Sequence, residues 1–171
     1  HRVAVVGAGN SGAQIAAELA LEGVDTTWFT KHPPRWMPDD VDGRVLFSRN
    51  RQRMLALAKG EPDPGSESEL GDIVMVPPVL KARDSGLLDT TPMFESLDEL
   101  TEQGFSDLIW ATGFRPALRP FTGLLAEGKP TVEGFFPVGY GTWTGPGSAT
   151  ITGVSPYARQ VAADIAELVR D

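Results

Sequence analysis

The sequence contains no cysteine. This absence excludes disulfide bonds, thiolate metal ligands, a CxxC redox pair and a cysteine nucleophile, so any redox chemistry has to come from a bound cofactor. Positive charge is also scarce, since 15 lysines and arginines stand against 23 aspartates and glutamates, and the net charge is -8. This balance argues against nucleic acid or an anionic membrane as the main partner. A phosphate-bearing ligand would therefore have to be held by local features of the chain.

Long apolar runs are missing as well. No stretch approaches the roughly 20 residues that a membrane span requires, and no basic-then-apolar signal segment opens the chain. We therefore expect a soluble, cytoplasmic protein. The chain starts with His1, and a strand pattern follows at once from Arg2. This start is typical of a piece of a longer protein.

The first 30 residues have the pattern of a βαβ unit. Residues 2–6 are a short β-branched run of the kind found in buried parallel strands. Apolar residues recur at helical spacing over residues 11–22, Gly23 supplies a helix stop, and residues 24–30 form a second strand pattern. The sequence therefore predicts an α/β fold, a Rossmann-like three-layer domain with a parallel sheet.

The remaining elements are predicted from shorter signals. Proline and charge in residues 31–43 predict a loop. We expect helices over residues 44–60, 79–85, 96–104 and 155–169. Strands are expected over residues 73–76 and 135–141, and residues 107–113 are expected to form an apolar strand that leads into a small-residue turn. The last helix is amphipathic, and its residues Val161, Ile165 and Leu168 are expected to face inward.

A glycine fingerprint, Gly7-Ala8-Gly9-Asn10-Ser11-Gly12, directly follows the first strand and opens the first helix. In such a motif Gly7 makes the tight turn, Gly9 lets the backbone approach a pyrophosphate, and Gly12 lets helix and strand pack closely. Helix amides and the helix dipole then attract the phosphates without a lysine. This context favours a dinucleotide site over a purely structural glycine turn.

The end of the second strand carries no acidic residue, and an acid there would accept a hydrogen bond from the ribose 2'-hydroxyl of NAD. The chain offers Thr30, Lys31, His32 and Arg35 instead, which are suited to a 2'-phosphate. NADPH is therefore the expected coenzyme, and a solvated basic loop is the alternative. The acids at positions 39, 40 and 42 lack the spacing of a calcium loop, so no metal site is expected.

The sequence resembles the flavin-containing monooxygenase superfamily in five segments, which cover nearly the whole chain in the family's order. They are VVGAGNSGAQIAAEL, TWFTKHPPRWMPDDVDGRVLF, GDIVMVPPVLKAR, DLIWATGFRPAL and VGYGTWTGPGSATITGV. The resemblance is greatest to the NAD(P)H-dependent flavin monooxygenases encoded in bacterial arsenic-resistance operons. In that family an FAD-binding domain is interrupted by an NADPH-binding domain and resumes at the C-terminus.

The resemblance implies two domains in this chain. Residues 1–134 would form the NADPH-binding Rossmann-like domain, and residues 135–171 the C-terminal strand, loop and helix of an FAD-type domain. Residues 111–113 are similar to the ATG motif, which passes between the two nucleotide sites, and residues 139–151 would belong to the FAD side. The predicted cofactor contacts are Gly7, Ala8, Gly9, Asn10, Ser11, Gly12, Thr30, Lys31, His32, Arg35, Ala111, Thr112, Gly113, Phe114, Arg115, Gly139, Tyr140, Gly141 and Thr142.

The chain departs from the family in three ways. The FAD fingerprint and the FxGxxxHxxxY-type signature, which should precede this domain, are absent, so we expect FAD binding by this chain to be weak or absent. Thr142 stands where the family would show an aspartate after glycine. Residues 91–105 are short for the family's strand meander, and SLDELTEQG within them has a helical pattern.

By this resemblance the chain is the NADPH-binding portion of a flavin-dependent monooxygenase or oxidoreductase, in which hydride passes from NADPH to FAD before a small substrate is oxygenated. No acid, base or nucleophile is predicted. The alternative is a stand-alone NADPH-binding or redox-sensing module without turnover. The expected partners are NADPH and a small-molecule substrate, neither nucleic acid nor a membrane is expected, and a homodimer is left open.

Overall fold

The protein is described from a computed structural model over residues 1–65, 69–127, 129–151 and 153–170. The chain divides into two compact units. Unit 1 comprises residues 1–49 and 65–113, and unit 2 comprises residues 50–64 and 114–171. The boundary predicted at residue 134 concerns which cofactor each part of the chain binds. The division into compact units does not test it, so it stays a prediction.

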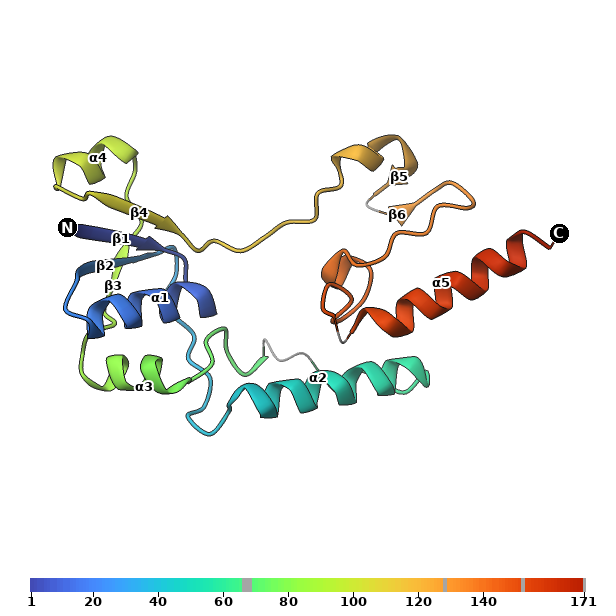
Figure 1. The fold of residues 1–171 in the computed structure, drawn as a ribbon, viewed down its shortest axis with the longest axis horizontal. Coiled ribbons are helices and arrows are strands. Elements are labelled where there is room, and N and C mark those ends of the chain that lie inside the picture. The colour runs from blue at the N-terminus through green and yellow to red at the C-terminus, as the bar shows by residue number, and fades with distance from the viewer. Residues whose placement is uncertain (66–68, 128, 152, 171) are drawn as a thin grey trace. The chain divides into compact units, whose positions relative to one another are not determined.

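Unit 1 is built on a sheet of four parallel strands in the order β3-β2-β1-β4 (Figure 1). These strands are β1 (Arg2–Val6), β2 (Asp25–Thr30), β3 (Thr90–Pro92) and β4 (Asp107–Trp110). Val5 of β1 stands beside Trp28 of β2 and Ile109 of β4. A central parallel strand is covered on both faces, which is why β1 is continuously apolar.

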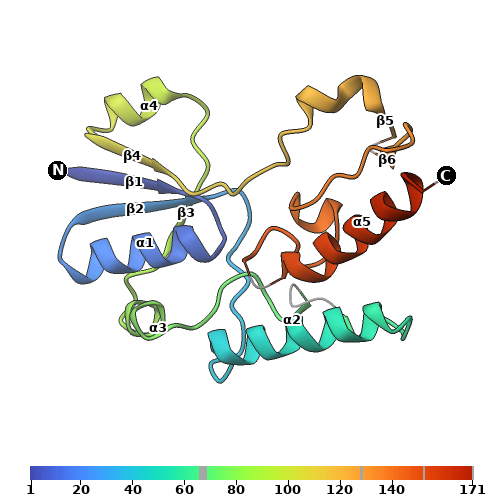
Figure 2. The same ribbon diagram turned by 45° about the vertical axis from the view of Figure 1, so that its right-hand side comes forward.

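Helices cover both faces of this sheet, as both ribbon views show (Figures 1 and 2). On one face lie α1 (Asn10–Leu21) and α3 (Pro77–Asp84), whose small residues pack around the fully buried Trp28 and Ile73. On the other face lies α4 (Leu97–Glu102), where Leu100 packs with Phe29. The predicted Rossmann-like, three-layer α/β fold with a parallel sheet is confirmed.

Two predictions in unit 1 need correction. Residues 73–76 do not form a strand, because only Ile73 makes a bridge, to Trp36. The helix predicted over residues 79–85 begins earlier, at Pro77, since proline suits the first turn of a helix, where its missing N–H is not needed. β3 was not predicted. The helix predicted over residues 96–104 is confirmed as α4, which the Ser96 side chain caps at Glu99.

The helix α2 (Gly43–Ala58) confirms the helical pattern after the proline loop, and it runs from unit 1 into unit 2. The other elements of unit 2 are short, apart from its last helix. They are the 3-10 helix η2 (Arg119–Leu124), the hairpin strands β5 (Leu125–Ala126) and β6 (Lys129–Pro130), the 3-10 helix η3 (Gly141–Trp143) and α5 (Val154–Leu168). Among the described helices, none has the length and apolar character needed to cross a membrane.

The strand predicted over residues 135–141 is wrong. This segment pairs with no strand among the described residues, and a strand is stable only when a ladder satisfies its backbone groups. The predicted inward face of α5 is also wrong for this chain. Val161 is half-buried, but Ile165 and Leu168 are 42% and 38% exposed. The α5 helix itself was predicted to within one residue at each end.

Candidate functional site

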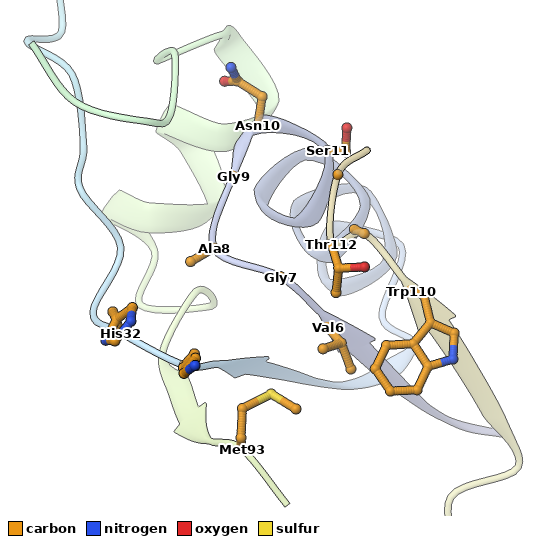
Figure 3. Close-up of a pocket in the computed structure, with 13 residues that line it drawn as sticks. Val6, Gly7, Ala8, Gly9, Asn10, Ser11, His32, Met93, Trp110 and Thr112 are labelled. Atoms are coloured by element: carbon orange, nitrogen blue, oxygen red, sulfur yellow. The ribbon is translucent and has the colours of Figure 1, made fainter. Parts of the chain in front are cut away.

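A pocket of about 530 Å³ lies in unit 1 at the carboxyl ends of the parallel strands. This is the edge at which open α/β sheets bind their ligands. Figure 3 shows the glycine segment Gly7–Ser11 crossing the pocket between the end of β2, which carries His32, and the end of β4, which carries Trp110 and Thr112. The structure thus brings together three segments that the sequence marked separately. Val6, Met93 and Trp110 also line the pocket and were not predicted.

Gly7 and Gly12 of the fingerprint have the geometry that their predicted structural tasks require. Gly7 has a φ of +132°, and a Cβ there would lie 2.2 Å from the carbonyl oxygen of Ala111. A Cβ at Gly12 would lie 2.0 Å from the carbonyl oxygen of Gly7. By contrast, a Cβ at Gly9 would meet nothing within 4 Å. The fold therefore requires glycine at positions 7 and 12. At Gly9 it does not, and the absence of a side chain leaves open space beside the loop.

The start of α1 is electrostatically suited to an anion. Gly9 is the N-cap residue, no side chain caps the first turn, and no acidic residue lies in that turn. The unpaired amides and the positive end of the helix dipole therefore favour negative charge here. Ser11 is exposed and lines the pocket. The Asn10 side chain, however, is used within the protein, because its Oδ1 accepts a hydrogen bond of 2.7 Å from the N–H of Val74.

The basic residues after β2 do not all reach the pocket. Lys31 and His32 are exposed, and both line the main pocket and a smaller cavity of about 160 Å³ beside it. Thr30 is buried and contributes to that smaller cavity, together with Thr90 of β3. Arg35 lines neither cavity, and its guanidinium lies 3.6 Å from the carboxylate of Asp72.

The acidic residues of the loop that follows have structural partners. Asp42 Oδ1 accepts hydrogen bonds from the N–H groups of Arg44 and Val45 and so caps the start of α2. Asp39 is held by the Arg83 guanidinium of α3 in two hydrogen bonds of 2.7 and 3.0 Å. Among the described residues, no cluster of acids and histidines could hold a metal ion. The hydrogen bond from Arg83 lowers the pKa of Asp39 below its usual value of 3.8.

The Asp39 ion pair predicts a pH-dependent stability. A carboxylate whose pKa is lowered in the folded protein stabilises the fold above its usual pKa, and this contribution is lost as the pH falls through the lowered value. Asp39→Asn should therefore lower the Tm at neutral pH, and its difference from the wild type should shrink below about pH 3.8. Asp40→Asn, an exposed carboxylate of the same loop, is the control. A difference for Asp39→Asn that is constant with pH would contradict this role.

The segment after β4 forms the remaining wall of the pocket. The N–H of Ala111 donates a 2.7 Å hydrogen bond to the carbonyl of Val6, which extends the β1–β4 ladder to the pocket edge. Thr112 and Gly113 follow as lining residues. Phe114 is fully exposed, Arg115 is exposed, and neither lines the pocket. Both belong to unit 2.

Residues 139–142, which were predicted for the FAD side, lie in a loop of unit 2 that internal hydrogen bonds stabilise. The Ser148 hydroxyl, fully buried, donates to the Gly141 carbonyl at 2.7 Å and lies 2.7 Å from the Thr144 hydroxyl. Thr144 in turn accepts from the N–H of Tyr140, whose ring packs edge-on against Trp143. The hydroxyls of Thr144 and Ser148 therefore form hydrogen bonds within the loop. Gly139 turns with a φ of +85°, and the side chain of Thr142 lies outside the described part of the chain.

The parallel sheet, the glycine turn after its first strand and the pocket at its carboxyl edge define a Rossmann-like α/β protein. No family model and no curated protein matches the sequence. Among solved structures, the chain is similar to a flavin-containing monooxygenase from Stenotrophomonas maltophilia, with 38% identity and a TM-score of 0.62 over 98% of this chain and 50% of that one. A double mutant of a flavin monooxygenase from the same organism gives 38% identity and a TM-score of 0.61, over 95% and 49% of the two chains.

The chain thus belongs to the flavin-containing monooxygenase superfamily, and it spans about half the length of the two solved structures. The predicted family is confirmed at this level. The finer likeness to enzymes of arsenic-resistance operons is not tested by these comparisons and stays a prediction.

Proposed function

We propose that this chain is the NADPH-binding portion of a flavin-dependent monooxygenase. The observation that carries the proposal is the convergence of the glycine loop, the cationic end of β2 and residues 111–113 on one pocket of about 530 Å³. These three segments are far apart in the sequence but meet at the sheet edge where dinucleotides bind in this fold class. The kinship to flavin monooxygenases supports a role for such a coenzyme.

The residues present fit a dinucleotide. The open space at Gly9 and the uncapped start of α1 suit a pyrophosphate, because the backbone can approach it closely and the helix end attracts its charge. Lys31 stands at the end of β2, where the 2'-phosphate of NADPH would lie, and its ammonium group can donate hydrogen bonds to that phosphate. We assign 2'-phosphate recognition to Lys31 first, with His32 beside it. Arg35 has a lesser part, since Asp72 holds its guanidinium outside the two cavities.

When bound in the complete enzyme, NADPH supplies a hydride to FAD, and the reduced flavin supplies the chemistry that oxygenates a small substrate. The residues of this chain bind and orient the coenzyme, and none is assigned as an acid, base or nucleophile. Residues Gly139–Thr142 are proposed to face the FAD side.

The proposal is tested by titrating NADPH into the purified chain and following the fluorescence of the nicotinamide. Transfer from water into the pocket is expected to raise this emission until one coenzyme is bound per chain. Unchanged emission together with no heat of binding in calorimetry would contradict the proposal.

One observation favours a second function, a stand-alone NADPH-binding or redox-sensing module. Every residue that lines the pocket belongs to unit 1, so the coenzyme contacts proposed here all come from one compact unit. The two functions differ in turnover. If added FAD accelerates the loss of NADPH absorbance, the chain takes part in flavin reduction. If the chain binds both NADPH and FAD but does not consume NADPH, the binding module is favoured.

A further inference from the structure

We infer that Trp28 is a positioning residue, which fixes the orientation of the glycine loop against the pyrophosphate. Trp28 lies within β2 and does not line the pocket. It acts from behind the loop, through the carbonyl group of Gly7. The inference rests on the proposed function, because it takes this loop as the pyrophosphate site.

Trp28 is held in one position by its surroundings. Its side chain is only 2% exposed and packs within the core between the sheet, α1 and α3. Its ring lies 5.9 Å from that of Trp36, at an angle of 57°. A buried indole N–H requires an acceptor, and here it donates a 2.7 Å hydrogen bond to the carbonyl oxygen of Gly7. The donor is thus both rigid and well placed.

The backbone of Gly7 is fixed from two sides by the same strand. Its N–H donates a 3.0 Å hydrogen bond to the carbonyl of Phe29, and its carbonyl accepts from Trp28. A glycine can adopt many backbone conformations, and these two hydrogen bonds select the one with a φ of +132° at Gly7. Neighbouring residues 28 and 29 of β2 therefore determine how the chain enters the loop.

The orientation of this peptide group matters for an anion. In a trans peptide the C=O and N–H groups point in opposite directions, so a Gly7 carbonyl turned toward the buried indole turns the N–H of Ala8 away from it. Ala8 lines the pocket. If the carbonyl were released, it could rotate and bring its negative end toward the bound phosphates. Trp28 thereby keeps the N–H of Ala8, rather than the carbonyl of Gly7, directed toward the ligand.

Gly12 completes the arrangement. A Cβ at this position would lie 3.3 Å from the indole nitrogen of Trp28 and 2.0 Å from the Gly7 oxygen. A side chain at position 12 would therefore collide with the oxygen that accepts the hydrogen bond from Trp28. Gly12 thus leaves room for the indole of Trp28 and also allows the helix to approach the strand closely.

The test compares Trp28→Phe with Trp36→Phe in the whole chain, with NADP⁺ binding measured by calorimetry at a temperature where all variants are folded. Both changes remove an indole from the same ring pair, but only the first removes the donor to Gly7. Trp28→Phe is expected to weaken NADP⁺ binding by about tenfold, and Trp36→Phe by less than about twofold. If Trp28→Phe fails to fold, benzothienylalanine at position 28 replaces it, because its sulfur removes the N–H with little change of shape.

A second ligand separates positioning from general loosening. Adenosine 2'-monophosphate carries the 2'-phosphate but no pyrophosphate, so its affinity should be the same in the wild type and the Trp28 variant. Equal NADP⁺ affinity in these two proteins, or an equal loss for both ligands, would overturn the role of Trp28 and leave the proposed function standing. A wild-type chain that does not bind NADP⁺ would overturn the proposed function itself.

Discussion

Gly7→Ala is expected to unfold unit 1 in part and to abolish NADPH binding. The new Cβ would lie 2.2 Å from the carbonyl oxygen of Ala111, and alanine is strained at a φ of +132°. Strain of this kind and overpacking each cost about 1–3 kcal/mol, so we expect a loss of about 2–6 kcal/mol in the free energy of unfolding. Urea denaturation followed by tryptophan fluorescence measures this loss.

Gly9→Ala is the matched comparison, since it makes the same chemical change two residues away. Its Cβ would meet no protein atom within 4 Å, and an alanine at an N-cap costs less than about 1 kcal/mol relative to glycine. The methyl group would instead occupy the space assigned to the pyrophosphate. We therefore expect near-normal stability with NADPH affinity reduced about tenfold or more. Wild-type affinity in Gly9→Ala would place the pyrophosphate elsewhere.

Lys31→Ala is expected to remove most of the preference for NADPH over NADH. Hydrogen bonds to charged groups contribute about 1.5–3 kcal/mol, so NADPH affinity should fall about 10- to 100-fold. NADH has no 2'-phosphate, and its affinity should change less than about twofold. Calorimetric titration of both coenzymes measures the two effects separately.

Lys81→Ala is the control for charge. It removes one lysine from the exposed surface of α3, outside the pocket, and changes the net charge by the same amount. It should leave both affinities unchanged. If Lys31→Ala weakens NADPH and NADH equally, Lys31 acts on a part of the ligand that the two coenzymes share, and its assignment to the 2'-phosphate is wrong.

The fold of the first 30 residues could be predicted because its signals are local. An unbroken apolar run, helical spacing and a terminal glycine fixed β1, α1 and β2 to within about a residue. β3 could not be predicted, because it has three residues and ends in Pro92. The strand expected over residues 135–141 failed for a different reason. Its residues favour an extended chain, but a strand also needs a pairing partner, which local sequence does not supply.

The candidate site divides in the same way. The glycine loop, Lys31, His32 and residues 111–113 were predicted from their motifs, and the structure brings them to one pocket. Met93 and Trp110 were missed, although each lies at or just after the carboxyl end of a strand, and that position was the available signal. Arg35 has the right charge for a phosphate but is drawn to Asp72. The sequence shows the charge of a loop residue, whereas the direction in which its side chain points depends on partners elsewhere in the fold.

The central claim, that this pocket binds NADPH through its 2'-phosphate, is tested most directly by calorimetric titration of the wild-type chain with NADPH and with NADH under identical conditions. We predict one NADPH per chain and an affinity at least about tenfold higher than that for NADH. Tighter binding of NADH, or equal binding of both, would contradict the claim.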